Sequence, residues 1–246
     1  MKTKLKLFSS IVVIIIALVF FIYPGVTLVR LMMDSQLKTT GQSSLVPGMF
    51  KDMAGRFKSW SDNYIETEFA GNVETENVAG TEWPMFGSVF FLVTADDLQK
   101  EGHIDATTGE LRKAVDNAAE IVVSPVTATW VRNMWGDTYL ENENVFYRMM
   151  LILGLASYES ITGDTRHHEL MKEQRLSLAD ELSRSYRFLL DDYPGECYPN
   201  DVLWAVAAIQ RAAALDGENH DELVKGLMEA YDGPVKSELG QPGFMM

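Results

Sequence analysis

The chain has 246 residues, a formal net charge of −14 and a single cysteine, and 47% of its residues are hydrophobic. This length and hydrophobic content are sufficient for a folded core, so they exclude an intrinsically disordered chain and a small disulfide-stabilised scaffold. A nucleic-acid-binding surface needs clustered basic residues, and the acidic composition argues against nucleic acid as a partner.

The N-terminal segment is the first predicted element, because residues 7–29 contain no charged side chain. About 20 apolar residues, at 1.5 Å of helix per residue, cross the hydrocarbon core of a bilayer. A cleaved signal peptide is the nearest alternative, since Lys2, Lys4 and Lys6 precede the hydrophobic run. The residues after that run lack the small-x-small pattern of a cleavage site, which favours an uncleaved membrane anchor over residues 1–31.

The distribution of charge predicts the orientation of this anchor. Lys2, Lys4 and Lys6 outweigh Arg30 and Lys38, so the positive-inside rule places the N-terminus in the cytoplasm. Four of the 21 basic residues lie in the first 30 positions, which hold no acidic residue, so residues 31–246 carry 17 basic against 35 acidic groups, a net charge of −18. We therefore expect a single-pass protein of the cell membrane with an acidic extracytoplasmic domain.

Residues 32–81 are predicted to form a linker and an amphipathic helix. The segment 35–47 is rich in Ser, Thr, Gln and Gly, which is typical of a linker. Five large apolar residues then follow at helical spacing and define one face of a helix: Phe50, Met53, Phe57, Trp60 and Tyr64. Residues 66–81 are acidic and contain two glycines, so a loop is expected there.

Residues 82–246 are predicted to be a domain of helical hairpins. Helical periodicity bounded by Gly, Pro and capping residues defines three pairs, with the Trp83-Pro84 step in the first turn of the first helix and Asp164 as the cap of the fourth. The pairs are 83–98 with 109–123, 142–161 with 164–190, and 200–215 with 219–231, and residues 191–195 are predicted to be a turn between the second and third pairs. No segment alternates with period two over a comparable length, so the predicted fold class is all-α.

Three groups of residues are candidates for chemistry. Cys197 precedes a predicted helix start, which favours a thiolate, although a structural buried thiol is the alternative. Polar residues around the Trp135-Gly136-Asp137 segment lie at the open end of a predicted helical hairpin, where they suit acid/base catalysis or helix capping. His167 and His168 point about 100° apart and lack a ligand one turn away, so no metal site is expected.

Four motifs together resemble the linalool dehydratase/isomerase family over about residues 83–231: Trp135-Gly136-Asp137, Glu143-Asn144-x-Phe146-Tyr147, Ile161-Thr162-Gly163 and Cys197-x-Pro199-Asn200. The resemblance implies an (α/α)6 toroid that hydrates, dehydrates or isomerises small terpenoid alcohols outside the cytoplasm, without a cofactor or metal. It also implies that Cys197 is catalytic and that Trp135, Asp137 and Tyr147 line a substrate-binding hole.

The match to the family pattern is partial. The second family cysteine corresponds to Val206, and the family histidine corresponds to Met150 or Met149. No motif marks the family's other acid/base residues, and a positioned acid and base are usually needed together. The enzyme class therefore stays open between a hydro-lyase or isomerase and the alternatives below.

The chain is predicted to contain three helical hairpins, which is half the number in a six-hairpin toroid. A truncated or split gene product, a ring completed by a partner chain or a second copy, and capping by the helix at 50–64 are all compatible with this number. Two other functions remain open. One is a non-catalytic binding or assembly subunit, and the other is a carbohydrate-active toroid in which Asp137 and Asp201 oppose each other.

Overall fold

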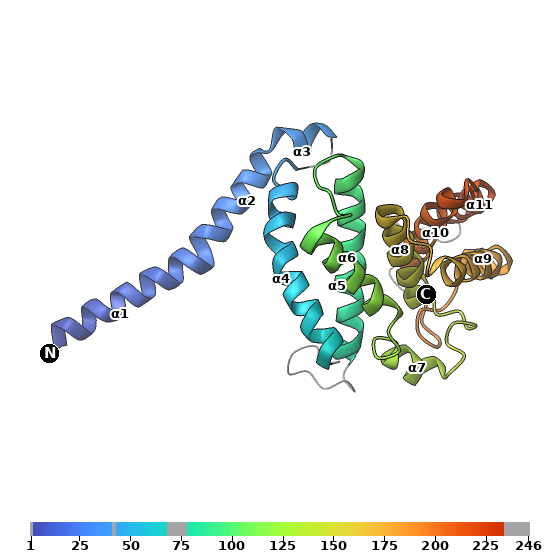
Figure 1. The fold of residues 1–246 in the computed structure, drawn as a ribbon, viewed down its shortest axis with the longest axis horizontal. Helices are drawn as coiled ribbons and strands as arrows, with labels where there is room; N and C mark the ends of the chain where they lie inside the picture. The colour runs from blue at the N-terminus through green and yellow to red at the C-terminus, as the bar shows by residue number, and fades with distance from the viewer. Residues whose placement is uncertain (1, 41–42, 68–77, 234–246) are drawn as a thin grey trace. The chain divides into compact units, whose positions relative to one another are not determined.

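The computed structural model describes residues 2–40, 43–67 and 78–233 (Figure 1). Every regular element in these ranges is a helix, which confirms the all-α prediction. The chain divides into two compact units, residues 1–52 and residues 53–246.

The first unit contains the predicted apolar helix. It runs through α1 (Lys2–Ala17), a π-helical turn (Leu18–Ile22) and α2 (Tyr23–Met33). The 24 residues of Ser10–Met33 form an apolar segment with a hydropathy of 2.8, and no residue of its apolar window is buried within the protein. A helix of this length and composition is sufficient to cross a bilayer. A signal sequence near an N-terminus meets the same criteria of length and composition.

The segment expected to be a linker is partly structured. A short helix, α3 (Ser35–Thr40), begins directly after Asp34, whose Oδ1 accepts hydrogen bonds from the backbone N–H groups of Gln36 and Leu37. The other oxygen, Oδ2, accepts from the Ser43 hydroxyl at 2.7 Å and from the Ser44 N–H at 2.8 Å. These bonds lower the pKa of Asp34 to about 2 against the opposing effect of burial. One carboxylate therefore folds residues 43–44 back to the end of the apolar helix, a long-range contact that composition does not reveal.

The second unit is built from helical hairpins. Its helices are α4 (Val46–Thr67, which begins in the first unit), α5 (Val78–Lys100), α6 (Gly109–Val123), α7 (Thr129–Trp135), α8 (Val145–Thr162), α9 (His168–Arg184), α10 (Pro199–Ala213) and α11 (Asp221–Tyr231). Short 3-10 turns follow α9 at Tyr186–Phe188 and α10 at Ala214–Asp216.

Helix α8 is the centre of this unit, and 14 of its 18 residues are buried. It runs parallel to α5, because Phe86 meets Phe146 at one end, with ring centroids 5.6 Å apart, and the Ser160 hydroxyl donates to Asp96 at 2.7 Å at the other. Gly154 allows close packing, since a Cβ at this position would lie 3.1 Å from a methyl group of α5.

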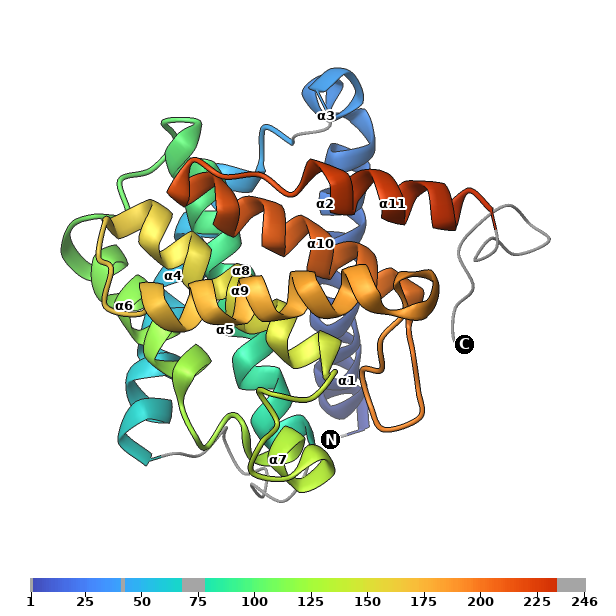
Figure 2. The same ribbon diagram turned by 90° about the vertical axis from the view of Figure 1, so that its right-hand side faces the viewer.

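Helix α10 runs parallel to α5 and α8. Its Trp204 ring meets Phe90 of α5 edge-on, and its Arg211 donates to Asp97 near the C-terminal end of α5 at 2.8 Å. Helices α6, α9 and α11 follow α5, α8 and α10 in the chain and run back in the opposite direction (Figures 1 and 2). Three parallel helices therefore begin at one end of the unit, and that end holds the candidate site.

Several predicted boundaries were wrong. Helix α5 begins at Val78, so Pro84 lies inside it; a proline removes one helical hydrogen bond, which the rest of a 23-residue helix tolerates. Asp164 does not cap α9, because its carboxylate accepts from Tyr158 and Arg166 instead, and α9 begins only at His168 and ends at Arg184. Helix α7 was not predicted. Of the loop expected at 66–81, residues 68–77 lie outside the described residues.

Candidate functional site

The loop between α9 and α10 passes the end of the unit where α5, α8 and α10 begin. It makes a tight reversal in which Glu196 N–H donates to Tyr193 O at 2.8 Å and Asp192 N–H donates to Glu196 O at 2.9 Å. Gly195 takes a φ of +83°, a left-handed conformation that favours glycine. The reversal directs Asp192 and Cys197 into the protein on either side of the turn.

Asp192 is the most unusual group at this site, because a carboxyl side chain is here wholly buried. Its Oδ2 accepts a hydrogen bond from the Tyr198 N–H at 2.9 Å. Burial raises the pKa of Asp192 to about 7, although the backbone amides of Tyr198 and Phe146 oppose this rise; the nearby charge of Asp201 adds to it. Sequence reasoning predicted only a turn at residues 191–195, since nothing local distinguishes Asp192 from an exposed turn residue.

Two further carboxyl groups lie near this loop. Glu82 is on α5 and Asp201 is in the first turn of α10, and partial burial raises the pKa of each. Burial also raises the pKa of the Tyr193 hydroxyl, and the charges of Glu82, Asp192 and Asp201 raise it further. Three carboxyls from three different elements therefore act on one tyrosine.

Cys197 is 5% exposed and directly precedes Tyr198, the residue that caps α10. Burial, and then the charges of Asp192 and Asp191, raise the pKa of its thiol to about 12. The expectation that the helix start favours a thiolate is corrected here, since desolvation and two neighbouring aspartates outweigh the helix dipole. Near neutral pH Cys197 is a protonated thiol that can donate a hydrogen bond.

Trp135 and Tyr147 reach the same end of the unit. The Trp135 indole N–H donates to the carbonyl oxygen of Asp192 at 3.3 Å. Tyr147 is buried and packs edge-on against Trp130 with ring centroids 6.2 Å apart, and Trp130 in turn lies 5.8 Å from Tyr193. The structure thus connects Trp135 directly, and Tyr147 through one ring, with the loop that carries Cys197.

Asp137 is placed differently from the other predicted site residues. Its side chain is 89% exposed and forms an ion pair with Arg132 at 2.8 Å. It lines a small depression of about 250 Å³ together with Thr129, Arg132 and Asn133. The family positions that depart from the motif, Met150 and Val206, are buried apolar residues and supply no ionisable group.

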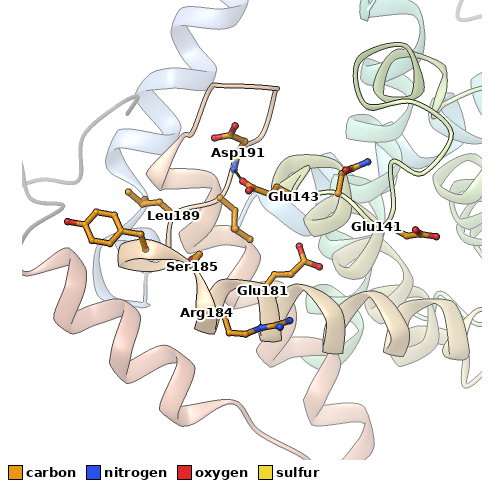
Figure 3. Close-up of a pocket in the computed structure, with 10 residues that line it drawn as sticks. Glu141, Glu143, Glu181, Arg184, Ser185, Leu189 and Asp191 are labelled. Atoms are coloured by element: carbon orange, nitrogen blue, oxygen red, sulfur yellow. Dashed lines mark hydrogen bonds between the residues drawn. The ribbon is translucent and has the colours of Figure 1, made fainter.

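A larger groove of about 680 Å³ opens beside the loop, between the start of α8 and the end of α9 (Figure 3). Four carboxylates line it, Glu141, Glu143, Glu181 and Asp191, together with Arg184. Glu143 Oε2 accepts a hydrogen bond from the Asp191 N–H at 2.6 Å, which ties the loop to the residues before α8. The acidic groove therefore reaches the residue next to Asp192.

Of the two histidines near the start of α9, His168 contacts carboxylates on two other elements. His168 Nδ1 lies 3.0 Å from the Glu159 carboxylate, and Nε2 lies 3.4 Å from Asp216. Within the described ranges, no three His, Cys, Asp or Glu side chains are grouped so that they could hold a metal ion.

No family model matches the chain, and comparison with curated proteins finds no significant match. Function is therefore argued from the side chains where α5, α8 and α10 begin. The residues there include the Trp135 indole, which donates a hydrogen bond to the loop, the Tyr193 hydroxyl and the neutral Cys197 thiol. Three carboxyls with raised pKa values, Asp192, Glu82 and Asp201, complete a set suited to proton transfer.

Proposed function

We propose that this protein is a membrane-anchored, extracytoplasmic acid/base enzyme, a hydro-lyase or isomerase resembling linalool dehydratase/isomerase that acts on a small hydrophobic alcohol. The observation that carries the proposal is the buried carboxyl of Asp192, which has a pKa raised to about 7 and lies next to Tyr193 and five residues before Cys197, in the loop at the shared helix end. Perturbed carboxyls of this kind concentrate at catalytic sites.

The chemistry follows from the protonation states. Dehydration of an alcohol requires an acid that protonates the departing hydroxyl, so that the C–O bond breaks and water leaves, and a base that takes a proton from the adjacent carbon. Protonated Asp192 supplies the acid, because both of its protonation states are populated near neutral pH. Asp201 or Glu82 is the base, and the Cys197 thiol donates a hydrogen bond to the substrate oxygen.

The arrangement of helices supports the toroid as a proposal. Helices α5, α8 and α10 form a parallel row, and α6, α9 and α11 return on the other side of each hairpin. An (α/α)6 toroid consists of such a row curved into a ring. We infer that this chain contributes three of its hairpins.

The proposed location rests on the Ser10–Met33 helix and on the lysines that precede it. Carbonate extraction tests the anchor, since an integral helix stays in the membrane pellet. Alkaline phosphatase fused after residue 233 tests the orientation, because it is active only outside the cytoplasm. Release by carbonate, or an inactive phosphatase fusion, would contradict the location.

The catalytic proposal is tested by alkene formation from small tertiary and allylic alcohols, measured by headspace gas chromatography. We expect Asp192→Asn to lower kcat by about 10²–10⁴-fold, the usual contribution of a positioned general acid, and Cys197→Ala to lower it without loss of helicity. Glu173→Gln is the matched control, since Glu173 is an exposed carboxyl on α9. Unchanged turnover in both site variants would overturn the proposal, and a stoichiometric partner chain without turnover would instead support the assembly function.

A further inference from the structure

An unusual surface feature of the second unit is a line of aromatic rings on α5 and α10, which we call the aromatic ridge: Trp83, Phe86, Phe90 and Trp204. Successive ring centroids along it are 5.9, 4.8 and 6.4 Å apart. Trp83 is 65% exposed, Phe90 40% and Trp204 52%. Single exposed apolar residues are ordinary, but a continuous row of large aromatic rings marks an interaction surface.

The ridge is uncharged along its length. Its α5 members recur at three- and four-residue spacing, so they share one helix face, and the exposed residues beside them, Gly87 and Ala207, are small and apolar. Among the described residues, charged side chains flank it at its two ends, with Glu82 next to Trp83 and Asp201 one turn before Trp204 at one and the Asp97–Arg211 ion pair at the other. A partner for this surface must therefore be apolar and need no basic or acidic contact.

The connection between the apolar helix and the second unit is short. The Asp34 carboxylate holds Ser43 and Ser44 at hydrogen-bond distance, so the chain returns to the end of the apolar helix before α4 begins. From Val46 to Met53 the chain is helical and rises by only about 10 Å. A tether this short keeps the second unit at high local concentration beside the bilayer.

We propose that the aromatic ridge docks on the interfacial region of a zwitterionic lipid bilayer, the membrane that holds the anchor. This inference rests on the membrane anchorage proposed above and not on the catalytic proposal. Trp rings settle at the headgroup level, where their apolar body and polar N–H are both solvated, and the Phe rings between them add apolar area that a bilayer can cover. Residues 31–246 carry a net charge of −18, so an anionic surface would repel the domain and a zwitterionic one would not.

The test places the photo-crosslinking residue p-benzoylphenylalanine at single positions of the full chain in phosphatidylcholine vesicles. Position 90 probes the ridge. Position 15, in the apolar helix, is the positive control for anchorage. Position 186 is the surface control, because Tyr186 is 75% exposed and belongs to another element. Adducts are identified by mass spectrometry.

We expect lipid adducts at positions 15 and 90, and a several-fold lower yield at 186. Lipid adducts at 15 with none at 90 would overturn the ridge proposal while leaving the anchor in place. A crosslinked dimer through position 90 would also overturn it, since the occupant would then be a second copy. Absence of lipid adducts at 15 would overturn the anchorage on which the proposal rests.

Discussion

Arg148 on α8 is fully buried, and its replacement by methionine is expected to destabilise the second unit strongly. Its guanidinium donates to Gln174 Oε1 at 2.9 Å, to Glu181 Oε2 at 2.8 Å and to the Asn142 carbonyl at 2.9 Å. A further bond reaches the Ser177 hydroxyl at 3.0 Å. One side chain thus joins α8, α9 and the residues before α8 that border the acidic groove.

The expected loss is about 3 kcal/mol in the free energy of unfolding. Breaking a buried ion pair by removing one partner typically costs about 3–5 kcal/mol, and the lower end applies because the Glu181 side chain is 24% exposed and regains some water. For a unit of this size the loss corresponds to roughly 6–12 °C in Tm. Thermal and urea unfolding in detergent micelles, followed by circular dichroism, measure both quantities.

Two matched variants sharpen the test. Arg184→Met removes an exposed arginine paired with Asp180 on the same helix, and the free energy of unfolding should change by at most about 0.5 kcal/mol. Arg148→Met combined with Glu181→Leu should recover part of the loss, because no unpaired carboxylate remains. A loss below about 1 kcal/mol in Arg148→Met would refute the reasoning.

Three other predictions concern titration, reactivity and packing. Because burial raises the pKa of Asp192 to about 7, the folded state keeps a proton that the unfolded chain releases near pH 4, so the free energy of unfolding should fall as pH rises from about 4 to 7. Urea titrations should show this fall diminished in Asp192→Asn, and an identical fall in the variant would contradict the assignment. Cys197, with a buried thiol of pKa about 12, should react with Ellman's reagent at pH 7.5 only after unfolding; rapid reaction of the folded protein would show an accessible thiolate. Gly226→Ala places a Cβ 2.5 Å from the Phe188 ring and should lower the free energy of unfolding by about 1–3 kcal/mol. Gly55→Ala, with nothing within 4 Å of the new Cβ, should raise it by about 0.5–1 kcal/mol. Shifts of Tm with the same sign in the two variants would disprove this.

The sequence by itself predicted the features that depend on neighbouring residues. Helical periodicity identified most of the helices, because residues three and four apart share a face wherever the helix lies in the fold. Gly163 marked the end of α8 correctly, since its φ of +66° is a left-handed conformation that glycine adopts readily. The uncharged run at 7–29 predicted a helix long enough to span a membrane for the same local reason.

Only the tertiary structure revealed the buried charges and the surfaces. Asp192 occupies what the sequence predicted to be an ordinary turn, and its raised pKa arises from burial together with Asp201 on another element. Arg148 lies in an apolar helix pattern that does not identify its partners 26 to 33 residues away. Desolvation and long-range pairing depend on which elements pack together, and periodicity within one element does not contain that information.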